Sequence, residues 1–246
     1  MTASVHTDGN GAETRWKAGT LQGTKRPVLD GVVAQIMLVV ARDEQGGTVL
    51  ALCDLNQNSV ERRQVETVDP TRPAAEVRFN GAAAELLGDA SGAQAAWESI
   101  RDRAAVLLAF EQIGTAHAAL QMARAYAHDR IAFGRKIGSF QAIKHKLADM
   151  FVKIELARSH CYYGAWAIST DAEEAPLAAA GARCTATDAL DYAAQENIQV
   201  HGGIGVTWES NCQLYYRRAR LNALILGSRY EWQDRLVTAL ETQRPA

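Results

Sequence analysis

Two short segments of this chain carry residue types that bind phosphate-bearing cofactors. Residues 130–141 read RIAFGRKIGSFQ, and residues 199–205 read QVHGGIG. An Arg side chain such as Arg130 can hold a phosphate through two parallel charged hydrogen bonds. Paired glycines let backbone N–H groups approach an anion closely because no Cβ stands in the way. Together the two segments predict a site for a diphosphate-bearing cofactor.

The same two segments resemble a known family. R-x-A-F-G-x-x-I-x-x-F-Q followed by Q-x-x-G-G-I-G is similar to the C-terminal helical domain of flavin-dependent acyl-CoA dehydrogenases. The resemblance continues through residues 146–150 and 214–220, and residues 21–31 resemble the opening of that family's middle β-domain. It is strongest to the non-catalytic subunit of the hetero-oligomeric acyl-CoA dehydrogenases that actinobacteria use on bulky or steroid-derived CoA esters.

The resemblance implies FAD as cofactor, shared across a subunit interface. Arg130 and Gln141 would contact the pyrophosphate and adenosine half of a neighbouring subunit's FAD, and Phe133 belongs to the same motif. Without the motif around it, Arg130 could equally be a helix C-terminal cation that the helix dipole favours.

The glycine segment would lie along the ADP portion of FAD. The resemblance carries this role to Gln199, Val200, His201, Gly202 and Gly203. A left-handed helix cap at Gly202 alone would explain one glycine, but not three within four positions. We assign no chemistry to His201.

The catalytic base of the family is missing at both of its usual positions. Acyl-CoA dehydrogenation needs a carboxylate to remove the α-proton while the β-hydride goes to the flavin. The Glu that follows the glycine turn in most members corresponds here to Leu226, and the alternative position on the first bundle helix corresponds to Ala104. Glu111 shares the helical face of Ala104 and is either a replacement base or the partner of a bundle neighbour. We therefore assign no catalytic residue.

The flavin-ring end of the site is also depleted. Residues 27–29 read Pro-Val-Leu where the family has Trp-Ile-Thr. The family's N-terminal helical domain has no counterpart either, so we expect a truncated product or a subunit that lacks that region.

Three functions remain open. The first is a subunit that lends the ADP-binding half of an FAD site to a catalytic acyl-CoA dehydrogenase partner in a heterotetramer, with an acyl-CoA as substrate and an electron-transfer flavoprotein as acceptor. The second is a self-sufficient, self-oligomerising FAD-dependent enzyme with an unusual base. The third is a structural subunit that binds no flavin.

The pattern of apolar residues and turn signals around these residues predicts an α+β fold that is mainly helical. Residues 1–90 are expected to form a partial antiparallel middle β-domain with a loose N-terminus over 1–14, and residues 91–246 a four-helix bundle domain. The expected strands are 32–41, 48–53, 65–68 and 75–79, with turns at Asn80-Gly81 and elsewhere. The expected helices are 93–127, 139–169 with Ser139 as N-cap, 173–200, 209–226 and 230–242.

Composition excludes several classes of protein. Of 246 residues, 48% are hydrophobic and 22% charged, and a net charge of −2 gives no reason to expect nucleic acid or an anionic membrane as partner. No apolar run approaches the ~20 residues that span a bilayer, and the N-terminus lacks the pattern of a secretory signal. The four cysteines lack metal-ligand spacing, so we expect reduced thiols, no metal and a cytoplasmic location.

Overall fold

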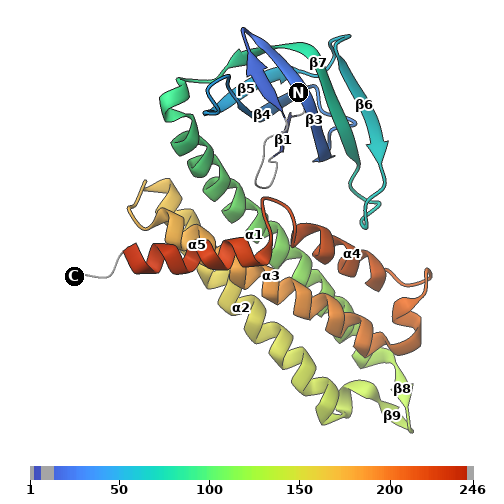
Figure 1. Cartoon of the computed structure of the whole chain (residues 1–246). Helices are drawn as coiled ribbons and strands as arrows, with labels where there is room; N and C mark the ends of the chain where they lie inside the picture. Colours follow the sequence, from blue (N-terminus) through green and yellow to red (C-terminus); the bar gives the residue numbers. More distant parts are fainter. Residues whose placement is uncertain (1–2, 7–13, 243–246) are drawn as a thin grey trace. The chain divides into compact units, whose positions relative to one another are not determined.

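The computed structural model describes residues 3–6 and 14–242. Contacts divide the chain into two compact units, Met1–Arg101 and Asp102–Ala246. Figure 1 shows a strand-rich N-terminal unit and a helical C-terminal unit, which are described separately here. The mainly helical α+β fold expected from the sequence is confirmed.

The first unit is a single mixed sheet. Its strands are β1 (Ala3–His6), β2 (Arg15–Lys17), β3 (Thr20–Leu29), β4 (Ile36–Arg42), β5 (Thr48–Asp54), β6 (Val60–Val65) and β7 (Ala74–Leu86). The pairings β4–β5, β5–β7, β7–β3, β3–β2 and β2–β4 form a closed ring, with β1 added beside β4 and β6 beside β7. All are antiparallel except β1–β4 and β2–β4. Residues 3–6 of the expected loose N-terminus therefore form a strand, whereas residues 1–2 and 7–13 lie outside the described residues.

Alternating burial fixes which face of each strand packs inward. Met37, Val39 and Ala41 of β4 are fully buried, as a period of two requires. The expected strand 65–68 is wrong: the strand is β6, whose exposed, charged middle carries no hydrophobic alternation. The expected turn at Asn80-Gly81 is also wrong. Gly81 has φ +73° and forms a bulge within β7, where the pairing with β3 shifts register.

The second unit is a helical bundle. Its helices are α1 (Ala90–Asp129), which begins in the first unit, α2 (Gln141–Ser169), α3 (Ala175–His201), α4 (Cys212–Asn222) and α5 (Arg229–Thr242). A short hairpin of β8 (Ile131–Ala132) and β9 (Arg135–Lys136) and the 3₁₀ turn η1 (Ile137–Ser139) connect α1 to α2, and the 3₁₀ turn η2 (Gly202–Val206) follows α3. The bundle core is rich in alanine and includes Ala116, Ala186 and Ala193. Within the described residues, no helix is long and apolar enough to cross a membrane.

Helix ends follow the sequence signals in most places. Pro176 lies in the first turn of α3, and Gly202 ends that helix at φ +63°. The prediction of Ser139 as N-cap is wrong, because Phe140 occupies the cap position of α2 and the Ser139 hydroxyl instead donates to the Lys136 carbonyl at 2.7 Å. The expected helix 209–226 is longer than the observed α4, which runs only from Cys212 to Asn222, and Leu226 within the expected range has a positive φ of +63°.

Candidate functional site

Arg130 lies where α1 gives way to the hairpin. Its N–H donates to the Tyr126 carbonyl at 2.8 Å, and its own carbonyl accepts from the Ile137 N–H at 2.9 Å. The hairpin tip is Phe133–Gly134, with φ of +53° and +76°. Two successive positive φ values are those of the tight turn that joins twisted strands. A bulky residue rarely adopts this conformation, and the Phe133 side chain is 96% exposed. The tip therefore presents an aromatic ring to the surroundings.

Gln141 is the exposed first residue of α2, next to the hairpin. Phe140, which precedes it, meets the Phe133 ring edge-on at 6.3 Å and lies under the Arg135 guanidinium at 3.9 Å. The connection back to α1 is tight, because a Cβ at Gly138 would stand 2.8 Å from the Ala127 carbonyl oxygen. Packing thus fixes Gln141 relative to the end of α1.

The three glycines of the second segment have different structural roles. Gly202 requires its positive φ, and a Cβ at buried Gly205 would meet the Ile198 carbonyl oxygen at 2.7 Å. Gly203 has neither constraint: its φ is not positive, and a Cβ there would meet nothing within 4 Å. Folding therefore does not require glycine at 203. Open space above a glycine backbone is what the close approach of another molecule needs.

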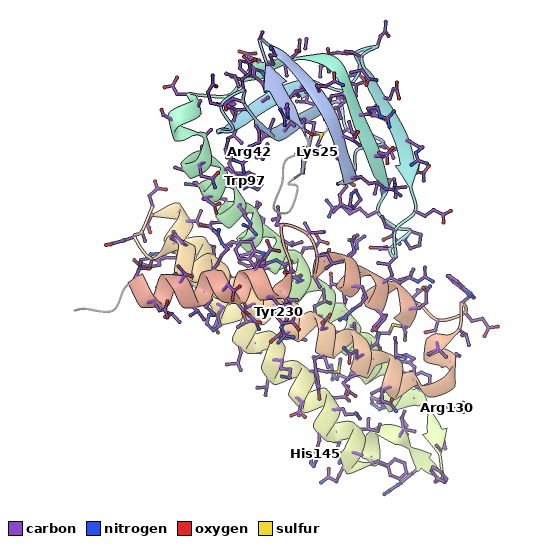
Figure 2. All side chains as sticks on the ribbon, in the orientation of Figure 1. Lys25, Arg42, Trp97, Arg130, His145 and Tyr230 are labelled. Carbon is purple, nitrogen blue, oxygen red and sulfur yellow. The ribbon has the colours of Figure 1, made fainter. Side chains whose placement is uncertain are left out.

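An aromatic stack joins the two segments. The His201 ring lies on the Tyr126 ring, with centroids 4.2 Å apart and planes 24° from parallel. His201 Nδ1 faces the Asn197 carbonyl at 2.8 Å, which orients the ring. Because Tyr126 also binds Arg130 through its backbone, the stack connects the glycine turn to the hairpin. Figure 2 labels Arg130 at this end of the bundle.

The remaining predicted residues separate into buried and exposed positions. Val200 packs in the bundle core and His201 is buried, so any contact that they make with a ligand must come from their backbone. Gln199, Gly202 and Gly203 are exposed. Sequence reasoning missed Tyr126, although its place four residues before Arg130, near the end of the expected helix, was a usable signal.

The local charge suits an anion. Arg130, Arg135 and Lys136 all come from the hairpin and are exposed. The Lys136 Nζ lies 3.1 Å from His128 Nδ1. Phe140 supplies no side-chain cap to α2, so the positive end of that helix adds to the field. These features fit the diphosphate of a dinucleotide.

Neither position at which the resembling family carries its base has a proton acceptor. Leu226, at φ +63°, packs beside Ala105 and Trp232, and Ala104 remains a methyl side chain on α1. Glu111 Oε1 accepts from Arg218 Nη1 and from Asn222 Nδ2, each at 3.1 Å. Glu111 therefore pairs with bundle neighbours, one of the two alternatives that the sequence left open.

A buried arginine that the sequence did not single out holds the segment after α4. Arg183 is 1% exposed, and burial lowers the pKa of its guanidinium to about 10. It donates to the carbonyls of Asn222 at 2.5 Å and Ile225 at 3.0 Å. On its other side it donates to the Gln112 amide at 2.9 Å and to the Thr187 hydroxyl. Arg183 therefore fixes the backbone that leads to Leu226.

The cysteines are unpaired thiols. Burial raises the pKa of Cys53 and Cys184 to about 11 and that of Cys161 to about 12. Such thiols stay protonated at neutral pH and are poor metal ligands or nucleophiles. Among the residues that the structure describes, no cluster of His, Cys, Asp or Glu could hold a metal.

The chain is similar to known proteins over most of its length. Residues 90–236 match the family model "Acyl-CoA dehydrogenase, C-terminal domain". Acyl-CoA dehydrogenase IpdE2 of Mycobacterium tuberculosis is 45% identical over 70% of this chain and 49% of its own length. Acyl-CoA dehydrogenase IpdE2 of Mycolicibacterium smegmatis is 39% identical over 89% of this chain and 63% of its own. A solved structure of the steroid ACAD Tcur3481-Tcur3483 is 28% identical with a TM-score of 0.82, over 98% of this chain and 62% of that one. The chain thus spans about half to three fifths of the length of these relatives.

Proposed function

Because this chain belongs to the acyl-CoA dehydrogenase family, we propose that it lends the ADP-binding half of an FAD site to a catalytic partner subunit. The reaction of the assembly is the α,β-dehydrogenation of an acyl-CoA. Residues 1–90 act as a partial middle β-domain and residues 91–246 as the bundle domain that carries the FAD contacts.

The geometry of the bundle end supports FAD as the ligand. Arg130 is exposed beside two further cations, and Gly203 leaves open space that no fold constraint explains. A guanidinium binds a diphosphate through paired charged hydrogen bonds, and the glycine backbone can approach the anion directly. Arg130 and Gln141 bind the pyrophosphate and adenosine half, and Gln199, Gly202 and Gly203 lie along the ADP portion.

The two positions at which the family carries its catalytic base hold no carboxylate here, which supports a non-catalytic role for this chain. When bound, FAD supplies the hydride acceptor of the reaction. Proton removal needs a base, and Leu226 and Ala104 cannot accept a proton. The partner subunit therefore supplies the base and the pocket for the flavin ring, whereas this chain binds and orients the ADP end.

One relative's name supports a substrate class. The name of the Tcur3481-Tcur3483 structure describes a steroid enzyme, which supports a CoA ester of lipid or steroid side-chain type. Electrons then pass from the assembly to an electron-transfer flavoprotein.

The observation that carries this proposal is the pairing of an intact ADP-side geometry with base positions that lack a carboxylate. The test is to express the chain alone and together with a catalytic acyl-CoA dehydrogenase subunit encoded next to it, and then to count FAD per chain. We expect little flavin on the chain alone and one FAD per heterodimer. Near-stoichiometric flavin and turnover in the chain alone would overturn the proposal, and a flavin-free heteromer would favour a structural subunit.

A further inference from the structure

Strand β6 leaves one edge of the sheet in the first unit without a partner strand. Among the described residues β6 pairs only with β7, and Figure 1 shows it beside β7 at the border of the sheet. None of its six residues is fully buried. An extended segment of another chain can add to such an edge as a further strand, through main-chain hydrogen bonds.

The register of β6 on β7 shows which backbone groups are available for this. The Asn80 N–H donates to the Ser59 carbonyl at 2.9 Å, so these opposite residues form a hydrogen-bonded pair. Such pairs alternate with non-bonded pairs along an antiparallel ladder, and the non-bonded positions of β6 include Arg62 and Gln64. Their N–H and C=O groups therefore point away from β7, toward the unpaired edge.

Each face of β6 carries one arginine. Arg62 and Arg63 are consecutive, so their side chains lie on opposite faces of the strand. Arg62 Nη1 donates to the carbonyls of Val32 and Ala34, at 3.2 and 2.9 Å, which fixes the guanidinium on its face. Because a guanidinium has five N–H donors, Arg62 keeps donors for a further acceptor.

A groove runs over β6 and β7 on the face of Arg63. It has a volume of about 370 Å³ and is lined by Glu61, Arg62, Arg63, Glu76 and Arg78. A single oxygen of Glu76 accepts from Arg26 at 3.2 Å and from Arg63 at 3.3 Å. One carboxylate therefore serves two guanidinium groups, and these three side chains together carry a net positive charge.

The second charged pair of the groove leaves another arginine without a carboxylate. Glu61 lies opposite Arg78 in the ladder, but Glu61 accepts from the Asn80 amide at 2.9 Å. Arg78 is exposed and forms no ion pair with any of the described residues. Both Arg63 and Arg78 thus have donors for an added anion, and carboxylates are the side chains that suit them.

The charges of β6 exclude two kinds of added strand. A second copy of β6, aligned at Arg62 and Arg63, would set like charges opposite each other and destabilise the pairing. An apolar strand would desolvate the arginines without replacing their lost contacts. Two consecutive acidic residues in an extended segment would instead point to opposite faces, and so would place one carboxylate beside each of these arginines.

We propose that the unpaired edge of β6 binds an extended, acidic segment of a partner protein. The segment adds as a strand along Arg62 and Gln64, and its consecutive carboxylates bind Arg62 and Arg63. The site lies within the first unit and uses none of the residues proposed to bind FAD, so it does not depend on the proposed function.

A labelled peptide tests the proposal on the full chain. The probe is Ser-Thr-Val-Glu-Glu-Val-Thr-Ser, and Ser-Thr-Val-Lys-Lys-Val-Thr-Ser is its matched control. Fluorescence anisotropy should show saturable binding of the acidic peptide that weakens as the ionic strength rises, because salt screens exposed charges. The basic peptide should bind at least about ten-fold more weakly. Equal binding of the two peptides, or no binding of the acidic one, would overturn the proposal.

A proline substitution tests whether the strand edge itself is used. Gln64→Pro removes an N–H that points away from β7, so the ladder within the sheet loses no hydrogen bond. It should weaken binding of the acidic peptide at least about ten-fold. Lys17→Glu on β2 is the control, because Lys17 is exposed and pairs only with Glu44 at 2.7 Å, and it should leave the affinity unchanged. Full affinity in a folded Gln64→Pro chain would contradict pairing at this edge.

A charge substitution keeps the proposal testable if Gln64→Pro fails to fold. Arg63→Gln leaves Glu76 paired with Arg26, so the sheet keeps that ion pair. It should weaken binding of the acidic peptide about five-fold, the effect of one exposed charge pair, and should flatten the dependence on salt. Unchanged affinity in Arg63→Gln would overturn the proposal, because the acidic segment would then not bind this arginine.

Discussion

At the scale of single residues, Gly203 is the glycine that we expect to matter for cofactor binding but not for folding. Gly202 and Gly205 are required by backbone conformation and by packing, whereas Gly203 faces open space with an ordinary φ. A sequence motif cannot make this distinction, since all three positions hold the same residue. The structure makes it because it shows what a Cβ would contact at each position.

This distinction predicts different outcomes for two substitutions. Gly203→Val should change the free energy of unfolding by less than about 1 kcal/mol, yet should lower FAD occupancy of the heteromer, because the new side chain would fill the space over the backbone. Gly205→Ala should lower the free energy of unfolding by roughly 1–3 kcal/mol, since its Cβ would meet the Ile198 carbonyl. Chemical denaturation and flavin absorbance measure the two effects. Full flavin occupancy in Gly203→Val would remove this residue from the proposed site.

Cysteine ionisation gives a second residue-scale prediction. Burial raises the folded-state pKa of Cys161 to about 12, whereas an unfolded thiol has a pKa near ~8.5. The folded chain therefore holds more protons between these values, and stability falls as the pH rises through this window. The loss approaches ~1.4 kcal/mol per pH unit for each such thiol.

The measurement is the free energy of unfolding between pH 8 and 11 in a reducing buffer. Cys161→Ala should reduce the alkaline slope, whatever its effect on stability at neutral pH. Identical slopes in the variant and the wild type would show that Cys161 does not contribute.

At the scale of elements, the segment between α4 and α5 depends on one buried cation. Arg183 donates to two carbonyls of this segment, and its other partners are neutral oxygens of Gln112 and Thr187. Buried acceptors that lose their donor cost about 1–3 kcal/mol each. Arg183 thus contributes to the backbone that holds Leu226 at positive φ.

Arg183→Met should therefore lower the free energy of unfolding by roughly 2–4 kcal/mol and speed hydrogen exchange of the amides in residues 223–228. Arg229→Met is the matched control. Arg229 is half-exposed and pairs with Asp188 at 2.9 Å, so its loss should cost less than about 1 kcal/mol. Equal stability of the two variants would contradict the role assigned to Arg183.

Elements with strong local signals were predictable from the sequence, and elements without them were not. Pro176 and Gly202 mark the ends of α3 chemically, so the sequence located that helix well. Strand β6 was misplaced because its charged residues give no alternation. The bulge at Gly81 was read as a turn because Asn-Gly has the same local preference in both.

The residues of the candidate site show the same contrast between local sequence signals and contacts over long sequence distances. The motifs indicated Arg130, Gln141 and the glycine turn as candidates, since each motif is a short run of neighbouring residues. Arg183 could not be found in this way, because its partners Gln112 and Asn222 are 71 and 39 residues away in the chain. An arginine with distant, neutral partners looks like any surface arginine until the fold is known.

At the scale of the whole molecule, one end of the helical unit carries the residues proposed to bind the cofactor. The end of the bundle near Arg130 carries cations and exposed glycines, which suit a cofactor held mainly by another subunit. The chain spans 49% of the length of one IpdE2 relative and 63% of the other.

The most direct test of the central claim compares two variants in the heteromer with its catalytic partner. Arg130→Ala should lower FAD occupancy by removing a charge-assisted contact worth roughly 1.5–3 kcal/mol, while turnover per bound flavin changes little. Glu111→Gln should leave both FAD occupancy and turnover per flavin unchanged, because Glu111 pairs with Arg218 and Asn222 and the proposal assigns the base to the partner. Collapse of turnover per flavin with Glu111→Gln, and not with Arg130→Ala, would contradict the non-catalytic assignment.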